Sequence, residues 1–320
     1  MAAVVAETPV PVVSTAVVVA QVEALREMVG ARCPVVSENE AIDALGALER
    51  LKNALAGVQA AVTVEFDQMR RAGERSRGVP AASRGRGVAG EVALARRESP
   101  ARGARLVGLA TALTDMPHTR AVLERGEISE WRATIMCQET GWLSVADRVR
   151  VDAVMAGHLA VLGEKKLRAE ARRVAQSLDL HGAVNHLEHA VNERRVTVRP
   201  ATGGMAYLTG FVPLTQAVAA YATLVRDADS ARSTGETGGR GKGQYMADRL
   251  VELVTGHETA TGTPVEIELV MSDQSLFGAS DSPGWLPGHG PLPAALARKI
   301  ASNPDTMVWV RRLFTAPETG

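Results

Sequence analysis

The chain has 320 residues, and its 36 lysines and arginines are balanced by 36 aspartates and glutamates, so the formal net charge is zero. This balance excludes a global field that would recruit nucleic acid or a membrane, so any such attraction must come from local patches. Aromatic residues make up only 3% of the chain, which favours packed helices over a β-sandwich or barrel. Cys33 and Cys137 give neither a disulfide framework nor a zinc-ligand spacing, and we expect a cytoplasmic protein.

Residues 1–36 are expected to be a flexible N-terminal segment with a short helix near Val18–Val29. The start of the chain has no basic n-region, and Pro9 and Pro11 interrupt its apolar run, which argues against a secretory signal. The uncharged run from Thr8 to Val22 is too short for a transmembrane helix, so no membrane contact is expected.

A long amphipathic helix is predicted from residue 38 to residue 70. Ser37 and Glu40 have the spacing of a capping box at its start. Apolar side chains then recur every three or four residues, close to a heptad period: Ile42, Leu45, Leu48, Leu51, Leu55, Val58, Val62, Phe66 and Met69. Few charges flank this stripe, so we expect it to pack within its own bundle, and a homodimer through helix 38–70 is the alternative.

An arginine-rich segment follows from Arg70 to Arg105, with ten arginines, three glutamates and no lysine. Its middle, residues 73–90, is rich in Gly, Ser and Arg without an apolar period, which predicts an exposed basic loop. Its arginines either lie along nucleic-acid phosphates or pair with acids of neighbouring helices, and no aromatic residue interleaves them for base stacking. The candidate DNA-binding residues in this segment are Arg84, Arg86, Arg96 and Arg97.

The stretch from Gly87 to Met136 predicts three helical segments with clear boundaries. Ser99 and Pro100 have the pattern of an N-cap followed by proline at the first helical position. Pro117 opens the next helix, Gly126 has the position of a left-handed C-terminal residue, and Ser129 caps the third helix.

Two further helices are predicted between residues 144 and 178, the first capped by Ser144. The second, from Glu164 to Leu178, carries a basic face that is either a second phosphate contact or an ordinary solvated surface. Its candidate DNA-binding residues are Lys165, Lys166, Arg172 and Arg173. Beyond it, His186 and His189 lie one helical turn apart, a spacing compatible with metal, although a polar helix surface explains them equally well.

The last part of the chain mixes short strands and helices. Residues 196–211 predict a hairpin, and helices are expected at 213–229, 244–256 and 292–300, with loops at 230–243 and 272–290. Strands near 265–271 and 307–312 are expected to join the hairpin in one small sheet. The expected fold is mainly α: a helical bundle over 37–192 with a long amphipathic helix, then a smaller α+β portion over 193–320.

Several short motifs occur in the same order as in a known family. They include Glu91–Arg96, the Met116-Pro117-His118-Thr119 step, the turn at Gly126 followed by Ile128-Ser129, and the Gly204-Met205 turn between two strands. Residues 245–253 and 286–298 continue the pattern. Over residues 40–320 the chain resembles the actinobacterial domain of unknown function 222, also called the thirteen-E-twelve repeat family. Met116, Val122, Gly203 and Ala316 depart from its usual residues.

The resemblance implies an association with HNH endonucleases, because in many family members an HNH domain follows a step like Thr315–Gly320. This sequence has no Asp-His or His-His dipeptide and no Cys-x-x-Cys pair of the kind that such a domain uses. We expect no catalytic residue and no cofactor in this chain, since a divalent metal would belong to the absent HNH domain. Two explanations stay open: a piece of a longer protein, or a protein that naturally lacks that domain.

Three functions follow, in order of preference. The first is a non-catalytic N-terminal module of an HNH endonuclease-like protein that contacts or positions DNA through the two basic segments. The second is a helical interaction or oligomerisation module built on helix 38–70, without nucleic-acid binding. The third is a metal enzyme using His186 and His189.

Overall fold

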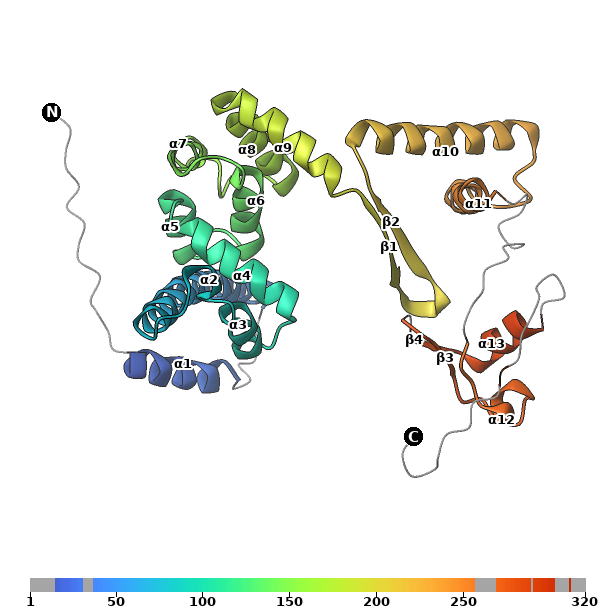
Figure 1. The fold of residues 1–320 in the computed structure, drawn as a ribbon, viewed down its shortest axis with the longest axis horizontal. Coiled ribbons are helices and arrows are strands. Elements are labelled where there is room, and N and C mark those ends of the chain that lie inside the picture. The colour runs from blue at the N-terminus through green and yellow to red at the C-terminus, as the bar shows by residue number, and fades with distance from the viewer. Residues whose placement is uncertain (1–14, 31–36, 257–268, 289, 303–310, 312–320) are drawn as a thin grey trace. The chain divides into compact units, whose positions relative to one another are not determined.

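A computed structural model describes residues 15–30, 37–256, 269–288, 290–302 and 311 (Figure 1). The chain divides into two compact units, Met1–Ala183 and Val184–Gly320, each described by itself. The domain boundary placed between residues 192 and 193 stays a prediction. No helix in the described ranges has the length and apolar character needed to cross a membrane.

The first unit is a helical bundle, as the caps and apolar periods predict. Its helices are α1 (Thr15–Gly30), α2 (Glu38–Ser76), α3 (Val88–Arg96), α4 (Pro100–Leu113), α5 (Pro117–Glu124), α6 (Glu130–Thr140), α7 (Val145–Met155) and α8 (Glu164–Leu178), with a 3₁₀ turn η1 at Ala81–Ser83. Four side-chain caps predicted from the sequence are confirmed. The hydroxyls of Ser37, Ser99, Ser129 and Ser144 each accept from the backbone N–H three residues later.

The core of this unit lies among α4, α5, α6, α7 and α8. Its fully buried side chains include Leu113, Met116, Leu123, Ile128, Ile135, Met136, Met155, Leu159 and Leu167. A smaller cluster of Val88, Val92 and Leu106 joins α3 to α4, with Phe66 of α2 packed against it. The aliphatic composition therefore builds a helical core, as expected.

The Met116–Thr119 step owes its geometry to a buried carboxylate from another helix. Asp152 of α7 accepts the backbone N–H groups of His118 and Thr119 at 2.7 and 3.0 Å, and the Thr119 hydroxyl at 2.5 Å. These groups lie in the first turn of α5, where Pro117 lacks an N–H and Met116 offers no side-chain cap. Asp152 thus caps α5 from α7, and it is itself fully buried.

Gly126 ends α5 in the left-handed conformation, with φ of 77°. A Cβ at this position would lie 2.2 Å from the carbonyl oxygen of Arg50 in α2, so glycine is required sterically as well. The Gly126 carbonyl accepts a hydrogen bond of 3.2 Å from the buried Asn53 amide. Gly126 is thus confirmed as the glycine that follows the C-terminus of α5, and its carbonyl also binds Asn53 of α2.

The long helix predicted over 38–70 is confirmed and runs on to Ser76, but the expectation for its apolar stripe is wrong. Its buried residues are Asn53, Gly57 and Thr63. Leu48, Val58, Val62 and other members of the stripe are exposed, and only Leu51 and Phe66 are half-buried. α2 packs on the bundle through its small and polar face, because Gly57 allows the backbone of Glu124 to come close.

The basic loop predicted over 73–90 is shorter than expected. α2 occupies its start and α3 its end, and residues 77–87 connect them through η1. Val88 and Val92 are buried, so a small apolar face packs α3 on the bundle. The many arginines around these two valines make that face hard to recognise in the sequence.

The second unit contains most of α9 (Leu180–Asn192), then β1 (Arg195–Pro200), the 3₁₀ turn η2 (Thr202–Gly204), β2 (Ala206–Phe211), α10 (Leu214–Thr234) and α11 (Lys242–Thr255). After a gap come α12 (Asp273–Leu276), β3 (Gly284–Leu286), β4 (Gly290–Leu292) and α13 (Ala294–Ala301). The predicted hairpin is confirmed as antiparallel β1–β2, with Arg195 opposite Phe211. Contrary to expectation, α10 extends into the loop predicted at 230–243, and α12 and β3 lie within the loop predicted at 272–290.

The two sheets of the described part of the chain are separate two-stranded pairs, β1–β2 and β3–β4. The strand predicted near 265–271 lies mostly outside the described residues, and its last part forms a single bridge between Val270 and Trp285. The strand predicted at 307–312 also falls outside the described residues, apart from Arg311. The mainly α fold with a small β portion is nonetheless as predicted.

Candidate functional site

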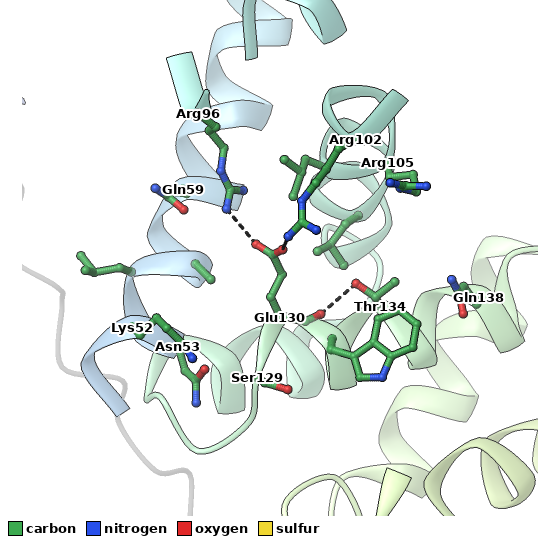
Figure 2. A pocket seen from close by; sticks show the side chains of 15 residues that line it. Lys52, Asn53, Gln59, Arg96, Arg102, Arg105, Ser129, Glu130, Thr134 and Gln138 are labelled. Atoms are coloured by element: carbon green, nitrogen blue, oxygen red, sulfur yellow. Dashed lines mark hydrogen bonds and ion pairs between the residues drawn. The ribbon is translucent and has the colours of Figure 1, made fainter. Parts of the chain in front are cut away.

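A cleft of about 850 Å³ opens between α2, α4 and α6 in the first unit (Figure 2). Four cationic side chains line it, from three helices: Lys52, Arg96, Arg102 and Arg105. Glu130 is the carboxylate in its lining, and Leu55, Ala56, Leu106 and Leu109 supply apolar surface. The lining therefore carries an excess of positive charge on a partly apolar floor.

Glu130, the first residue of α6, organises the cations at the centre of the cleft. Figure 2 shows Arg96 and Arg102 directed at its carboxylate from either side, and the ion pairs measure 3.0 and 3.6 Å. Arg102 also pairs with Glu98 at 3.0 Å. Two guanidinium groups thus share one carboxylate and retain N–H donors for a further anion.

The other two cations of the cleft are less constrained. Lys52 pairs with Glu49 on its own helix at 2.6 Å, and both side chains are more than half exposed. The exposed Arg105 makes no ion pair within the described ranges. Exposed pairs of this kind contribute at most about 1 kcal/mol, so a polyanion displaces the intramolecular partner at little cost.

Trp131 connects this cleft to the second basic segment. Its side chain lines the cleft and is 48% exposed. Its indole N–H donates to Oε2 of Glu164, the first residue of α8, at 3.2 Å. The Arg168 guanidinium lies 6.0 Å from the ring centroid. The consecutive residues Glu130 and Trp131 therefore join the two basic segments that lie far apart in the sequence.

Of the candidate DNA-binding residues in the first basic segment, one lies in the cleft and the other three lie outside it. Arg96 lies in the cleft, paired with Glu130. Arg84 donates to the Val79 carbonyl at 2.8 Å and thereby closes its own loop. Arg86 and Arg97 are exposed and make no side-chain ion pair in the described part of the chain, and neither lines the cleft. Arg97 ends α3 with a φ of 54°, which is unusual for a residue other than glycine.

Within the described ranges, two of the four candidate DNA-binding residues in α8 already form ion pairs, and the other two do not. Arg172 bonds to Glu139 of α6 at 2.9 Å, and this hydrogen bond raises the pKa of its guanidinium. Arg173 pairs with Glu170 at 2.6 Å, which lowers the pKa of that carboxyl. Lys165 and Lys166 are exposed, without an ion pair among the described residues, and directly follow Glu164. Arg172 therefore fastens α8 to α6, and the two lysines are available to a ligand.

Sequence reasoning did not single out Lys52, Arg102, Arg105 or Trp131. Arg102 and Arg105 lie three residues apart on a helix whose start is marked by Ser99 and Pro100, so their common face was predictable. The approach of Trp131 to the arginines is tertiary and leaves no local pattern.

Among the described residues, no group of three or more His, Cys, Asp or Glu side chains is placed to hold a metal ion. His189 lines a 280 Å³ depression on α9 with Asn185, Glu188 and Asn192. Burial raises the pKa of the Cys137 thiol to about 12, so this thiol is protonated near neutral pH.

The fold and the cleft define a mainly α protein with a basic surface cleft. The family model of the "Domain of unknown function (DUF222)" matches residues 42–320, so the chain belongs to this family. No curated protein and no solved structure matches the chain.

Proposed function

We propose that this chain is a DNA-contacting module without catalytic activity of its own, acting as the N-terminal part of a cytoplasmic, actinobacterial HNH endonuclease-like protein. Cleavage and its divalent metal would then belong to an HNH domain. The cleft between α2, α4 and α6 and the adjoining start of α8 would hold the phosphate backbone.

The observation that carries this proposal is the convergence of the two basic segments on Glu130 and Trp131. Lys52, Arg96, Arg102 and Arg105 line one cleft with a single carboxylate, and Lys165 and Lys166 follow the residue bonded to Trp131. The net charge of the whole chain is zero, so this local excess is matched by acids elsewhere. Guanidinium groups that retain donors bind phosphate oxygens without regard to base sequence.

The test is binding of the full chain to a labelled DNA duplex and to the same sequence as a single strand, at about 50 and 200 mM salt. We expect affinity to fall steeply with salt, and a nicking assay in Mg²⁺ or Mn²⁺ to show no cleavage. Absence of binding at the lower salt concentration would refute DNA contact. Metal-dependent nicking would refute the proposal that the chain has no catalytic activity of its own.

The variant that tests the surface is the triple substitution Arg105→Ala, Lys165→Ala, Lys166→Ala. These exposed side chains hold no ion pair in the described ranges, so the fold is unaffected, unlike with alanine at Arg84 or Arg96. The slope of log affinity against log salt should fall by about one for each cation that contacts a phosphate. The matched control removes three exposed cations from other places: Arg150→Ala, Arg226→Ala, Lys299→Ala. Equal losses in both variants would contradict the proposed surface.

One observation favours the second function, a protein-interaction module. The apolar stripe of α2 is exposed although the helix is fully formed, and soluble monomers rarely expose contiguous apolar surface of this kind. DNA contact and protein interaction would meet at Leu55, which belongs to the apolar stripe and also lines the cleft, so the two functions would share one edge of α2.

A further inference from the structure

We propose that α2 pairs in antiparallel fashion with α2 of a second copy of this chain. The surface is a stripe, here called the seam, whose members alternate in steps of four and three residues: Ala44, Leu48, Leu51, Leu55, Val58, Val62, Glu65 and Met69. This spacing is that of the a and d positions of a coiled coil.

The burial of α2 shows that the seam is not used inside the bundle. Asn53 and Gly57 hold the helix on α5 through the opposite face, at the f and c positions of the same heptads. Apart from the half-buried Leu51, the seam side chains stay accessible: Leu48 is 46% exposed, Val62 55% and Met69 66%. A coiled-coil stripe therefore remains on a helix that is already anchored.

The length of the seam favours a second α2 as the occupant. From Ala44 to Met69 it spans about 38 Å at the rise of an α-helix. α1 also exposes apolar side chains, but its 16 residues span only about 24 Å, so it is too short to cover the seam. A second copy of α2 matches the full length.

The charges at the two ends of α2 set the direction. The first turns carry Glu38, Glu40 and Asp43, and the last turns carry Arg70, Arg71 and Arg75 against Asp67 and Glu74, an excess of one positive charge. Arg70 and Arg71 already pair with Glu91 and Asp67 in the monomer. In an antiparallel pair the acidic end of one helix lies beside the basic end of the other, whereas a parallel pair puts like charges together.

The seam itself is self-complementary in the antiparallel direction. Setting Leu55 opposite the partner's Val58 also sets Leu51 opposite the partner's Val62, and Ala44 opposite the partner's Met69. Glu65 then meets the partner's Leu48, one turn from the partner's Lys52, and a parallel pair in register would instead bring the two Glu65 carboxylates together. Ala47, Ala54 and Ala61 border the seam on one side and leave room for a close approach.

Sedimentation equilibrium of the full chain without DNA tests the association. We expect a concentration-dependent mass that approaches twice 33.8 kDa. The double substitution Val58→Asp, Val62→Asp should weaken dimerisation at least 100-fold, because it buries four carboxylates in the pair. The control is Val149→Asp, Val154→Asp on α7, where the valines are 40% and 56% exposed, against 48% and 55% in the seam. A wild-type monomer at every concentration, or a dimer that survives the seam variant, would overturn the proposal.

Cysteine crosslinking tests the direction and does not depend on the aspartate variants. In a Cys33→Ser background, the pair Ala44→Cys, Met69→Cys should give an oxidised dimer, and each single substitution should give almost none. The native Cys137 should interfere little, because its thiol is half-buried and its raised pKa of about 12 leaves almost no thiolate. Efficient crosslinking by Met69→Cys alone would show a parallel pair and would overturn the antiparallel arrangement.

Discussion

The indole N–H of Trp131 and the Oε2 atom of Glu164 lie 3.2 Å apart, and this hydrogen bond joins α6 to the start of α8. On the preceding residue, Glu130 receives Arg96 and Arg102. A single step along α6 therefore brings together the two basic segments of the chain and places a half-exposed aromatic ring among their cations.

Replacing Trp131 with alanine should weaken binding to single-stranded DNA by about 1–3 kcal/mol, the contribution of one base stacked on an aromatic ring. The salt dependence should not change, since no cation is lost. Fluorescence anisotropy with a short labelled oligonucleotide measures both quantities. Trp285→Ala removes an equally exposed indole, 53% against 48%, and should have no effect.

Replacing Arg97 with glycine should raise stability and leave DNA binding unchanged. Arg97 has a φ of 54°, a conformation that costs an ordinary L-residue about 1 kcal/mol more than glycine. The free energy of unfolding, measured in urea, should therefore rise. The salt-dependent affinity for DNA should stay unchanged, because Arg97 does not line the cleft. Arg97→Lys keeps a side chain at the positive φ and should show no gain in stability.

Replacing Thr119 with valine should lower the free energy of unfolding by about 1–3 kcal/mol, since the buried Asp152 carboxylate then loses one of its three donors. Urea denaturation followed by circular dichroism measures the change. Thr111→Val removes an exposed hydroxyl that bonds to the Val107 carbonyl on its own helix, and should cost less than about 0.5 kcal/mol. Equal effects of the two substitutions would contradict the capping role of Asp152.

Replacing Gly126 with alanine should destabilise the bundle by more than about 2 kcal/mol, because the methyl group clashes with the Arg50 carbonyl and the φ of 77° is strained. Gly108→Ala in α4 is the control, since a Cβ there meets nothing within 4 Å. It should instead stabilise the protein by up to about 1 kcal/mol through helix propensity. Thermal melting of the two variants should thus shift in opposite directions.

The Cys137 thiol should resist modification in the folded protein. Burial raises its pKa from 9.0 to about 12, so at pH 8.5 almost none of it is thiolate, whereas in the unfolded chain a substantial part is ionised. The folded state binds this proton more tightly, so its contribution to stability is complete below pH 9 and is lost as the pH rises towards 12. A thiol-reactive chromophore at pH 8.5, with and without denaturant in a Cys33→Ser background, measures the contrast.

The helices and their boundaries could be predicted because their determinants are local. Ser99, Ser129 and Ser144 accept from N–H groups three residues away, and Gly126 adopts the left-handed conformation in its own turn. The apolar period of α2 gave its length but not its orientation. An apolar period shows that the two faces of a helix differ, but it does not show which face packs on the bundle. Here the face with Asn53 and Gly57 packs, because a close approach of two backbones needs small side chains.

The candidate site was predicted only in part, for a related reason. The composition of residues 70–105 and 165–173 identified two groups of cations. Which of these cations are already paired depends on acids from other helices, such as Glu139 for Arg172 and Glu130 for Arg96. The hydrogen bond from Trp131 to Glu164 spans 33 residues, and no pattern within a single helix predicts it.

The two faces of α2 can change independently during evolution. Asn53 and Gly57 attach the helix to the bundle, and they are constrained by the Gly126 carbonyl and by the backbone of Glu124. Leu48, Val58 and Val62 contribute little to the folded core, since each is about half exposed. Substitutions along that face can therefore accumulate without unfolding the protein, so the proposed pairing could be lost or altered while the fold is kept.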